Sequence, residues 1–298
     1  MRARSMLFTL FGDYVRHYGG TIWIGSLIAL MAELGFSAQA VRAAVSRMGR
    51  QGWLTPRRVG RASYYLLTPR GRDRIEEAAQ RIFKLHPERW DGLWRVLVVA
   101  TGGRDRGHLA ALRRELTWMG WAPLSRGVYL TPNDLLDRTA ALLERYGLGD
   151  RWESFTARHE GPAPDRSVVG RYWDLEAIDR AYGAFVDTWR PRLEEWRRAQ
   201  SAGEVPADAA SFREKTLLVH EFRKFLFVDP GLPQELLPPR WNGLEARAVF
   251  SASYHLLAEG AVRFFEHHYR PAPGHDADFA EGRRAARRDP FRPLTSVG

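Results

Sequence analysis

Residues 37–67 read SAQAVRAAVSRMGRQGWLTPRRVGRASYYLL, and this stretch decides how the first third of the chain folds. Ser37 is a good helix N-cap, and the helix that follows it is expected to run to about Gln51 and to close at Gly52. Residues 53–67 then form two β-rich runs around a turn that contains glycine. The pattern predicts a helix followed by a β-hairpin with basic residues at its tip.

Two more helices are expected before this stretch. Residues 4–17 repeat apolar side chains at helical spacing, and a short extended piece then leads into a second helix over residues 25–33. Three helices with short glycine-marked connections, followed by a basic hairpin, are typical of a winged helix-turn-helix. We therefore predict a DNA-binding domain over residues 1–86, with a connecting helix that ends near His86-Pro87.

The two faces of the third helix carry different kinds of side chain. At 100° per residue, the side chains expected to pack inward share one face: Val41, Ala44, Val45 and Met48. In a winged helix-turn-helix, the first residues of this helix reach base edges, and other basic residues reach phosphates. The predicted contacts are Gln39 and Arg42 with base edges, Ser46, Arg47 and Arg50 with phosphates, and Arg57, Arg58 and Arg61 of the hairpin with the backbone or the minor groove.

The positive charge of the chain is concentrated in the same region. Residues 1–86 carry 14 Lys and Arg against five Asp and Glu, a balance of +9. Residues 87–281 carry 26 against 29, a balance of −3, and the last 17 residues carry five against one, a balance of +4. Arginine supplies 42 of the 45 basic residues, as a GC-rich genome would produce, but that bias would raise arginine everywhere. The asymmetry therefore favours one nucleic-acid-facing module on a nearly neutral body.

After residue 87 the pattern of apolar residues changes. A buried-type strand at 94–100 is followed by a helix at 105–120, two short strands within 122–130, a helix capped by Asn133, and a last strand at 152–158. The order β-α-β-β-α-β is that of the ferredoxin-like split motif. We therefore predict a ferredoxin-like domain over residues 87–165, whose sheet edge and sheet face are natural places for self-pairing.

The remaining chain is predicted to be mainly helical. Apparent helices at 174–199, 209–228 and 243–268 make up a C-terminal domain over residues 166–270. Residues 271–298 hold four prolines and a cluster of arginines, and they are interpreted as a basic Pro-rich tail. The fold class is thus α+β: an N-terminal winged helix-turn-helix, a central ferredoxin-like domain and a C-terminal helical domain.

Composition and missing motifs exclude several classes of protein. The chain has no cysteine, which excludes disulfide frameworks, thiolate nucleophiles, Fe–S clusters and cysteine-ligated zinc. The longest strongly apolar run, Ile22–Ala32, has only 11 residues and is too short to span a bilayer. The sequence has no Gly-rich phosphate loop, G-x-S-x-G elbow or Rossmann fingerprint. We expect a cytoplasmic protein that is not an enzyme and needs no cofactor; a nuclease or a CoA-thioester hydrolase is a minor alternative.

The nine histidines do not form a recognised metal-binding pattern. His220-Glu221, His255 and His267-His268 contain residue types that bind zinc, but no HExxH or other ligand spacing occurs. Adjacent histidines on a helix also face different sides. We therefore expect structural histidines and no metal site.

Several motifs are specific enough to indicate a family. They are RSMLFTLFGDY at 4–14, IWIGSLI at 22–28, AVRAAVSRM at 40–48, GRQGWL at 49–54 and RVGRASYY at 58–65. This series resembles the PaaX family of bacterial regulators of phenylacetate catabolism. LVHEFRKF at 218–225 is also similar to a stretch typical of that family, so the resemblance covers nearly the whole chain.

The resemblance implies a homodimeric repressor that binds double-stranded operator DNA, an inverted repeat, and releases it on binding phenylacetyl-CoA or a related aryl-acyl-CoA. It also implies that the central and C-terminal domains serve dimerisation and effector sensing. Such a ligand needs an apolar slot for its ring and cations for its phosphates. The candidate effector residues are the aromatic Tyr172, Trp173 and Trp241 and the basic Arg171, Arg223 and Lys224. The main alternative is a dimeric DNA-binding protein without a small-molecule effector.

Overall fold

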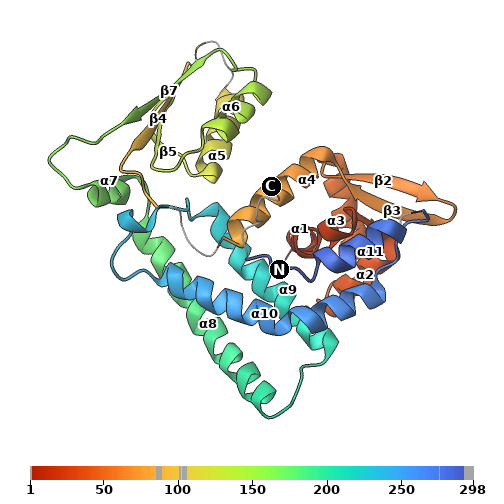
Figure 1. Cartoon of the computed structure of the whole chain (residues 1–298). Helices are drawn as coiled ribbons and strands as arrows, with labels where there is room; N and C mark the ends of the chain where they lie inside the picture. Colours follow the sequence, from red (N-terminus) through yellow and green to blue (C-terminus); the bar gives the residue numbers. More distant parts are fainter. Residues whose placement is uncertain (1, 85–88, 101, 103–105, 275, 292–298) are drawn as a thin grey trace. The chain divides into compact units, whose positions relative to one another are not determined.

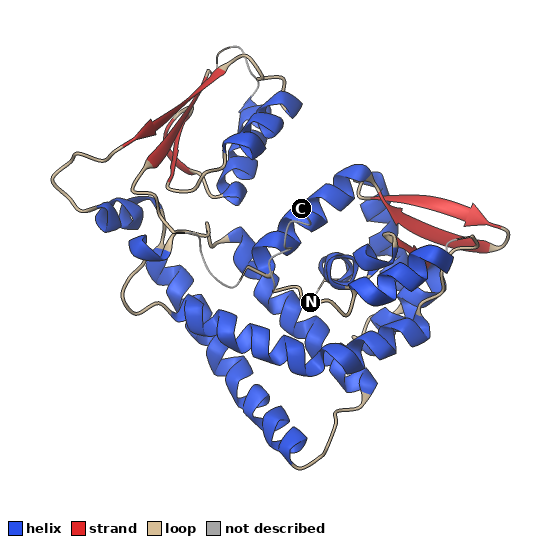
Figure 2. Cartoon of the chain, in the orientation of Figure 1, coloured by secondary structure: helices blue, strands red, loops and turns tan. Residues whose placement is uncertain are grey.

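The computed structural model describes residues 2–84, 89–100, 102, 106–274 and 276–291. The chain divides into two compact units, residues 1–85, 185–223 and 246–298 in the first and residues 86–184 and 224–245 in the second. Each unit holds one small sheet, and helices predominate (Figure 2). No helix within the described ranges is long and apolar enough to cross a bilayer. The first unit combines residues from the first, third and fourth predicted domains, and the boundaries between the four predicted domains stay predictions.

The N-terminal part of the first unit contains a three-stranded antiparallel sheet, and its β2-β3 hairpin extends away from the helices (Figure 1). Its elements are α1 (Ala3–Asp13), η1 (Val15–Tyr18), β1 (Thr21–Trp23), α2 (Ile24–Glu33), α3 (Ala38–Arg50), β2 (Leu54–Val59), β3 (Ala62–Leu67) and α4 (Pro69–Ile82). The strand order is β1-β3-β2, so β2 and β3 form the hairpin expected from the sequence. α4 ends at Ile82, and its predicted end near His86-Pro87 falls outside the described residues.

α3 forms where the sequence predicts it. The Ser37 hydroxyl accepts a hydrogen bond from the Ala40 backbone N–H at 3.2 Å, which confirms the predicted N-cap. The four apolar side chains predicted to pack inward are all 0% exposed: Val41, Ala44, Val45 and Met48. Because this face is buried, the opposite face of α3 is the one that solvent or a ligand can reach.

The second unit contains a four-stranded antiparallel sheet. Its elements are β4 (Trp94–Val99), α5 (Arg106–Met119), β5 (Ala122–Ser125), β6 (Val128–Thr131), α6 (Leu136–Arg145) and β7 (Trp152–Ala157), in the predicted β-α-β-β-α-β order. The strands lie in the order β5-β6-β4-β7. α5 and α6 cover one face of this sheet, where Leu97, Leu112 and Leu142 are buried in one cluster (Figure 1).

The other face of this sheet is covered only in part. α7 (Asp165–Tyr172), a helix that the sequence analysis missed, packs there together with η3 (Gln234–Leu236) against Trp94 and Leu130. Phe155 lies on the same face, because its partner Val96 is two residues from Trp94 on β4. Its side chain is 54% exposed. Part of this face is therefore apolar and open.

The predicted N-cap of α6 is wrong. The helix begins after Leu135, and the Asp134 carboxylate accepts a hydrogen bond from the Leu136 backbone N–H at 3.3 Å. Asn133 instead donates from its side-chain amide to the Gly231 carbonyl oxygen at 3.1 Å. Asn133 was assigned as a cap because the residue type suits that position, but a distant segment of the chain takes its hydrogen bond.

Helices from the C-terminal part of the chain complete the first unit. α9 (Asp208–Phe222) continues as the 3₁₀ turn η2 (Arg223–Phe227), so the α-helix predicted over 209–228 ends earlier than expected. α8 (Leu175–Ser201) and α10 (Asn242–His268) contribute their later residues to this unit. The apolar core joins α1 to α9 and α10 through residues that are 0% exposed, among them Leu7, Phe11, Phe212 and Phe265.

The predicted tail contains a helix. α11 (Asp276–Ala285) packs on η1 so closely that a Cβ on Gly282 would lie 2.5 Å from the Tyr18 ring (Figure 1). Further along, Phe291 is only 8% exposed, and the centre of its ring lies 5.3 Å from that of Phe83. The prolines and arginines of this region conceal its few apolar anchors, so composition alone did not reveal the helix.

A buried ion pair joins α1 to α9. The Lys215 ammonium donates to an Asp13 carboxylate oxygen at 2.6 Å, and each side chain is 1% exposed. The Tyr254 hydroxyl of α10 donates to the other carboxylate oxygen at 3.0 Å. The ammonium also lies 4.3 Å from the centre of the Tyr14 ring and 4.1 Å from that of Tyr254. Burial lowers the pKa of Lys215, and the charge of Asp13 opposes that change.

Asp13→Asn should lower the free energy of unfolding by about 3–5 kcal/mol, because it leaves the Lys215 ammonium buried without a counter-charge. The midpoint of urea unfolding, followed by circular dichroism, measures this decrease. The triple variant Asp13→Leu/Lys215→Met/Tyr254→Phe should recover most of it, since it removes both charges and also the Tyr254 hydroxyl that would lose its acceptor. A single variant as stable as the parent would contradict the importance of the pair.

Candidate DNA-binding surface

The eight residues predicted to contact DNA are all exposed, and all belong to the first unit. Five lie on α3: Gln39, Arg42, Ser46, Arg47 and Arg50. Arg57 and Arg58 lie on β2, and Arg61 lies in the turn that joins β2 to β3. Because one face of α3 is buried, only the side chains on its other side can contact a partner. These five residues are among them.

The exposed side chains of α3 have the chemistry of base and phosphate recognition. The Gln39 amide can pair with adenine, and the Arg42 guanidinium can pair with guanine. Further along the helix, Arg50 Nη1 donates to the Ser46 hydroxyl at 3.4 Å, so these two predicted phosphate contacts lie together. The first turn of α3 contains no acidic residue that would repel DNA.

The hairpin places arginines on both of its faces. Arg57 pairs across the strands with Tyr64, and Arg58 pairs with Ser63. Because successive strand residues point to opposite faces, these two arginines lie on opposite sides of the hairpin. Gly60 supplies the turn with φ 58°, a conformation that side chains disfavour, and Arg61 comes next. The tip is therefore a tight turn surrounded by cations.

A groove beside α3 adds two arginines that the sequence analysis did not select. Its volume is about 750 Å³, and it is lined by Arg2, Ala3, Arg4, Phe36, Ser37, Gln39, Ala40, Ala43 and Arg47. Arg4 Nη1 donates to the Gln51 side-chain oxygen at 3.1 Å, which holds it close to the C-terminal end of α3. The packing of α1 beside α3 is tertiary, so the order of residues did not reveal this neighbourhood.

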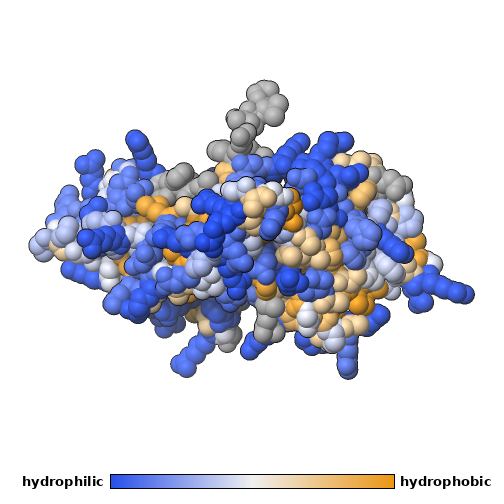
Figure 3. All heavy atoms as spheres, turned by 90° about the horizontal axis from the view of Figure 1, so that it is seen from below, coloured by the Kyte–Doolittle hydropathy of each residue, from blue (hydrophilic) through white to orange (hydrophobic). Residues whose placement is uncertain are grey.

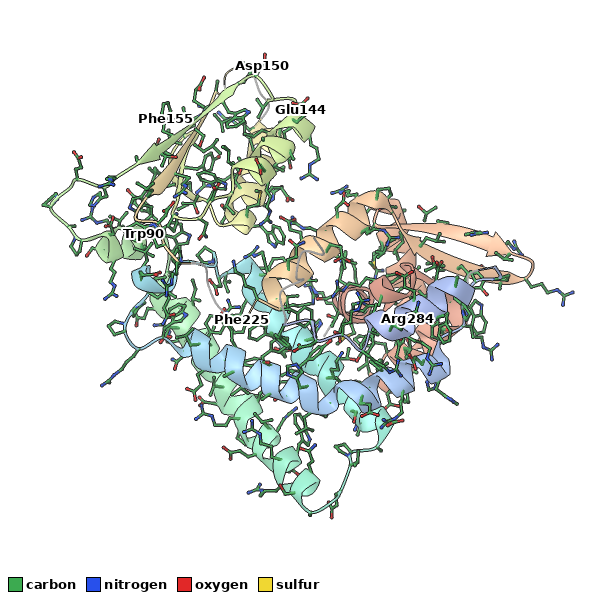
Figure 4. All side chains as sticks on the ribbon, in the orientation of Figure 1. Trp90, Glu144, Asp150, Phe155, Phe225 and Arg284 are labelled. Atoms are coloured by element: carbon green, nitrogen blue, oxygen red, sulfur yellow. The ribbon has the colours of Figure 1, made fainter. Side chains whose placement is uncertain are left out.

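Hydrophilic residues alone do not identify this surface. They cover much of the face drawn in Figure 3, with smaller apolar areas between them. Arginines also occur elsewhere, such as Arg284 on α11 (Figure 4). What distinguishes α3 is a set of exposed cations, with the amide of Gln39, on a helix whose other side is buried. The hairpin adds exposed arginines on both of its faces.

A separate cavity in the second unit includes one candidate effector residue. Its volume is about 320 Å³, and it is lined by Arg166, Gln234, Glu235, Leu237, Pro238, Pro239, Trp241 and Leu244. Arg166 was not selected from the sequence; its Nε donates to the Glu235 carbonyl oxygen at 2.8 Å. The lining combines apolar side chains with Arg166, Gln234 and Glu235, so the cavity can take a ligand that has an apolar part and a polar part.

The chain matches three protein-family descriptions along its length. PaaX-like protein matches residues 2–71, the PaaX protein central Cas2-like domain matches residues 87–169, and the PaaX-like protein C-terminal domain matches residues 173–267. The chain belongs to the PaaX family. These matches confirm the resemblance that the sequence motifs indicated. They cover the N-terminal, central and C-terminal regions of the chain.

Two proteins of known sequence or structure are similar to this chain. The transcriptional repressor PaaX of Escherichia coli strain K12 is 34% identical over 263 residues, which cover 87% of this chain and 82% of that protein. The solved structure of the uncharacterized protein Rv0674 from Mycobacterium tuberculosis is 25% identical, covers 80% of this chain and 89% of its own, and superposes with a TM-score of 0.47.

In this PaaX-family chain, two of the histidines considered as metal ligands have other partners. His220 Nδ1 lies 2.9 Å from the Thr9 hydroxyl, and His255 Nε2 lies 2.9 Å from the Asp289 carboxylate. Within the part of the chain that the structure describes, no three or more His, Cys, Asp or Glu side chains come together as metal ligands would.

The candidate effector residues fall into two groups. Five belong to the second unit: Arg171, Tyr172, Trp173, Lys224 and Trp241. Of these, Trp173 and Trp241 pack against one apolar cluster. Arg223 belongs to the first unit, where its Nε donates to the Thr9 hydroxyl at 2.8 Å and its Nη2 to the Ser5 carbonyl oxygen at 2.7 Å. Burial lowers the pKa of Arg223 to about 10, so it remains charged at neutral pH.

Arg223→Lys should lower the free energy of unfolding of this PaaX-family protein by about 1–3 kcal/mol, because an ammonium cannot reproduce the guanidinium contacts with Ser5 and Thr9. Thermal unfolding followed by circular dichroism measures the change. Arg171→Lys, at an exposed position, is the matched control and should change stability by less than about 0.5 kcal/mol. Equal, small changes in the two variants would argue against a structural role for Arg223.

Proposed function

We propose that this protein is a homodimeric transcriptional repressor of phenylacetate catabolism genes that binds operator DNA and releases it on binding an aryl-acyl-CoA. The observation that carries the proposal is the buried apolar face of α3 with five exposed candidate DNA contacts on its other side. Membership in the PaaX family, and the similarity to a transcriptional repressor, support the same function.

The N-terminal elements support a winged helix-turn-helix. Their order is helix, strand, two helices and a two-stranded hairpin, and the hairpin pairs with the early strand β1. In this motif the second helix of the helix-turn-helix enters the major groove, and the hairpin acts as a wing beside it. α3 would then read base edges with Gln39 and Arg42, while the hairpin arginines contact the backbone or the minor groove.

The second unit supports a ferredoxin-like domain that helps the chain to dimerise. Its elements follow the ferredoxin-like order, and its family match is described as Cas2-like. Phe155 lies on the face of the sheet away from α5 and α6 (Figure 4), and Val98 on the same face is 36% exposed. A second copy would cover these apolar groups. Two α3 helices about 34 Å apart would then meet successive major grooves of an inverted repeat.

The effector proposed is phenylacetyl-CoA or a related aryl-acyl-CoA. The cavity beside Trp241 offers an indole, prolines and leucines for the aromatic ring, and Arg166 for an anionic group. Its volume of about 320 Å³ suits the acyl end of such a thioester, with the rest of the CoA outside. Tyr172, 41% exposed at the end of α7, and Lys224 are further candidates in this unit.

In the proposed mechanism the ligand favours a form of the dimer in which the two α3 helices no longer match the operator. A ligand can shift this equilibrium only by its difference in affinity for the two forms. Each tenfold decrease in operator affinity requires a difference of about 1.4 kcal/mol. A dimer without an effector would bind the same DNA but would not respond to the thioester. The match to a repressor family disfavours the nuclease and hydrolase alternatives.

Arg42→Ala should weaken binding to the operator by about tenfold or more while changing binding to random DNA much less, because a base contact carries sequence information. Fluorescence anisotropy titrations on the two duplexes measure the ratio. Equal decreases on both duplexes would place Arg42 on the backbone and not on a base.

Arg57→Ala and Arg61→Ala should weaken binding to operator and random DNA by similar factors, because an interaction with the backbone is independent of sequence. Each variant should also lower the slope of log affinity against log salt, by about 0.9 for every phosphate that the protein no longer neutralises. A decrease confined to the operator would instead indicate base reading by the wing.

Phenylacetyl-CoA should release the operator in a gel-shift titration, whereas phenylacetate and free CoA, added separately, should not, because each supplies only part of the ligand. Without ligand, the Trp241→Ala variant should bind DNA as tightly as the parent protein. Its release from the operator should need a higher concentration of the thioester. Release of both proteins at the same concentration would move the effector site away from Trp241. Tight binding unchanged by all three compounds would leave a DNA-binding protein without this effector.

A further inference from the structure

The groove beside α3 has one charge sign along its whole length. We call the nine residues that line it the basic groove: Arg2, Ala3, Arg4, Phe36, Ser37, Gln39, Ala40, Ala43 and Arg47. Three of these are arginines, and none is acidic. Arg2, Arg4 and Arg47 are all exposed, so an anion in the groove would meet cations that water also reaches.

The shape of the basic groove follows from two helices. Gln39, Ala43 and Arg47 are spaced by four residues and form one stripe along α3, about 12 Å long at the rise of an α-helix. The middle residue is alanine, which leaves a hollow between two longer side chains. The start of α1, with Arg2 and Arg4, forms the opposite wall.

One wall of the basic groove therefore belongs to the predicted DNA-reading face, and the other does not. Gln39 is a predicted base contact and Arg47 a predicted phosphate contact, and both lie on α3. Arg4 comes from α1, and its hydrogen bond with Gln51 holds it beside the C-terminal end of α3. A DNA strand that met Arg47 from outside would lie within reach of the arginines opposite.

We propose that the basic groove receives the sugar-phosphate backbone of one DNA strand, at the edge of the major groove that α3 enters. Arg2 and Arg4 contact phosphates there, and Ala43 leaves room for the strand. The inference rests on the proposed DNA-binding function and adds the start of α1 to the binding surface. Contacts with phosphates position the protein and carry no sequence information, so these arginines contribute affinity and register.

The first test is the salt dependence of binding. The double variant Arg2→Ala/Arg4→Ala should weaken binding to operator and random DNA equally, by about tenfold for each charged hydrogen bond removed. The slope of log affinity against log salt should fall by about 0.9 for each phosphate that is no longer neutralised. The double variant Arg197→Ala/Arg198→Ala, which removes two exposed arginines of α8, is the control for the change in net charge and should leave the slope unchanged.

A second test locates the contacts on the DNA. Replacing single phosphates by neutral methylphosphonates should weaken binding of the parent protein at the positions that the basic groove receives. At those positions the Arg2→Ala/Arg4→Ala variant should show no further decrease in affinity, because its arginines no longer reach the phosphate. Methylphosphonates at positions that the hairpin contacts should still weaken the binding of both proteins.

A third variant tests the shape of the groove without changing its charge. Ala43→Leu fills the hollow at an exposed helical position that tolerates leucine, so urea unfolding should remain unchanged while both DNAs bind less tightly. Unchanged affinity, salt slope and methylphosphonate pattern in these groove variants would overturn the inference, even if Arg42→Ala still loses its preference for the operator. Failure of the parent protein to bind any duplex would instead overturn the proposed function itself.

Discussion

The contact between the Asp13 carboxylate and the Lys215 ammonium constrains how the first unit is put together. Two charges that are each 1% exposed must remain paired, since the cost of burying either one alone is several kcal/mol. Tyr254 satisfies the second carboxylate oxygen, so α1, α9 and α10 can pack in only one register. Further polar contacts extend this fixed arrangement along α1, where Thr9 meets His220 and Arg223. α3 packs on α1, and the position of the DNA-reading helix therefore depends on residues near the end of the chain.

In the proposed function, this dependence would give the C-terminal helices a role in the response to a ligand. In the proposed mechanism, an acyl-CoA binds the cavity that Leu244 and Trp241 line. Leu244 belongs to α10, and Tyr254, which holds Asp13, lies on the same helix. A shift of this helix would disturb the buried ion pair, and the packing of α1 would have to change with it.

The sequence predicted what repeats locally and missed what depends on tertiary contacts. The period of Val41, Val45 and Met48, together with the cap at Ser37, was enough to place α3 and its faces. The eight candidate contacts followed from those faces and from the hairpin pattern, and they are exposed as expected. In contrast, Asp13 only interrupted an apolar run in the sequence, and its partner Lys215 is 202 residues away. Arg223 was interpreted as a ligand contact because a basic side chain in an aromatic region suits a phosphate, but α1 provides its observed partners. The basic groove and α11 were missed for the same reason: each is defined by packing between distant segments.

The most direct test of this account is the ratio of the dissociation constants of the purified protein for random and operator DNA, measured across a range of salt concentrations. The account predicts that the operator binds at least about 10³-fold more tightly at physiological salt, because base contacts from α3 add to the contacts with phosphates. It also predicts that both affinities fall steeply as salt rises. A ratio near one, or affinities that do not change with salt, would contradict sequence-specific binding of DNA through α3 and the hairpin.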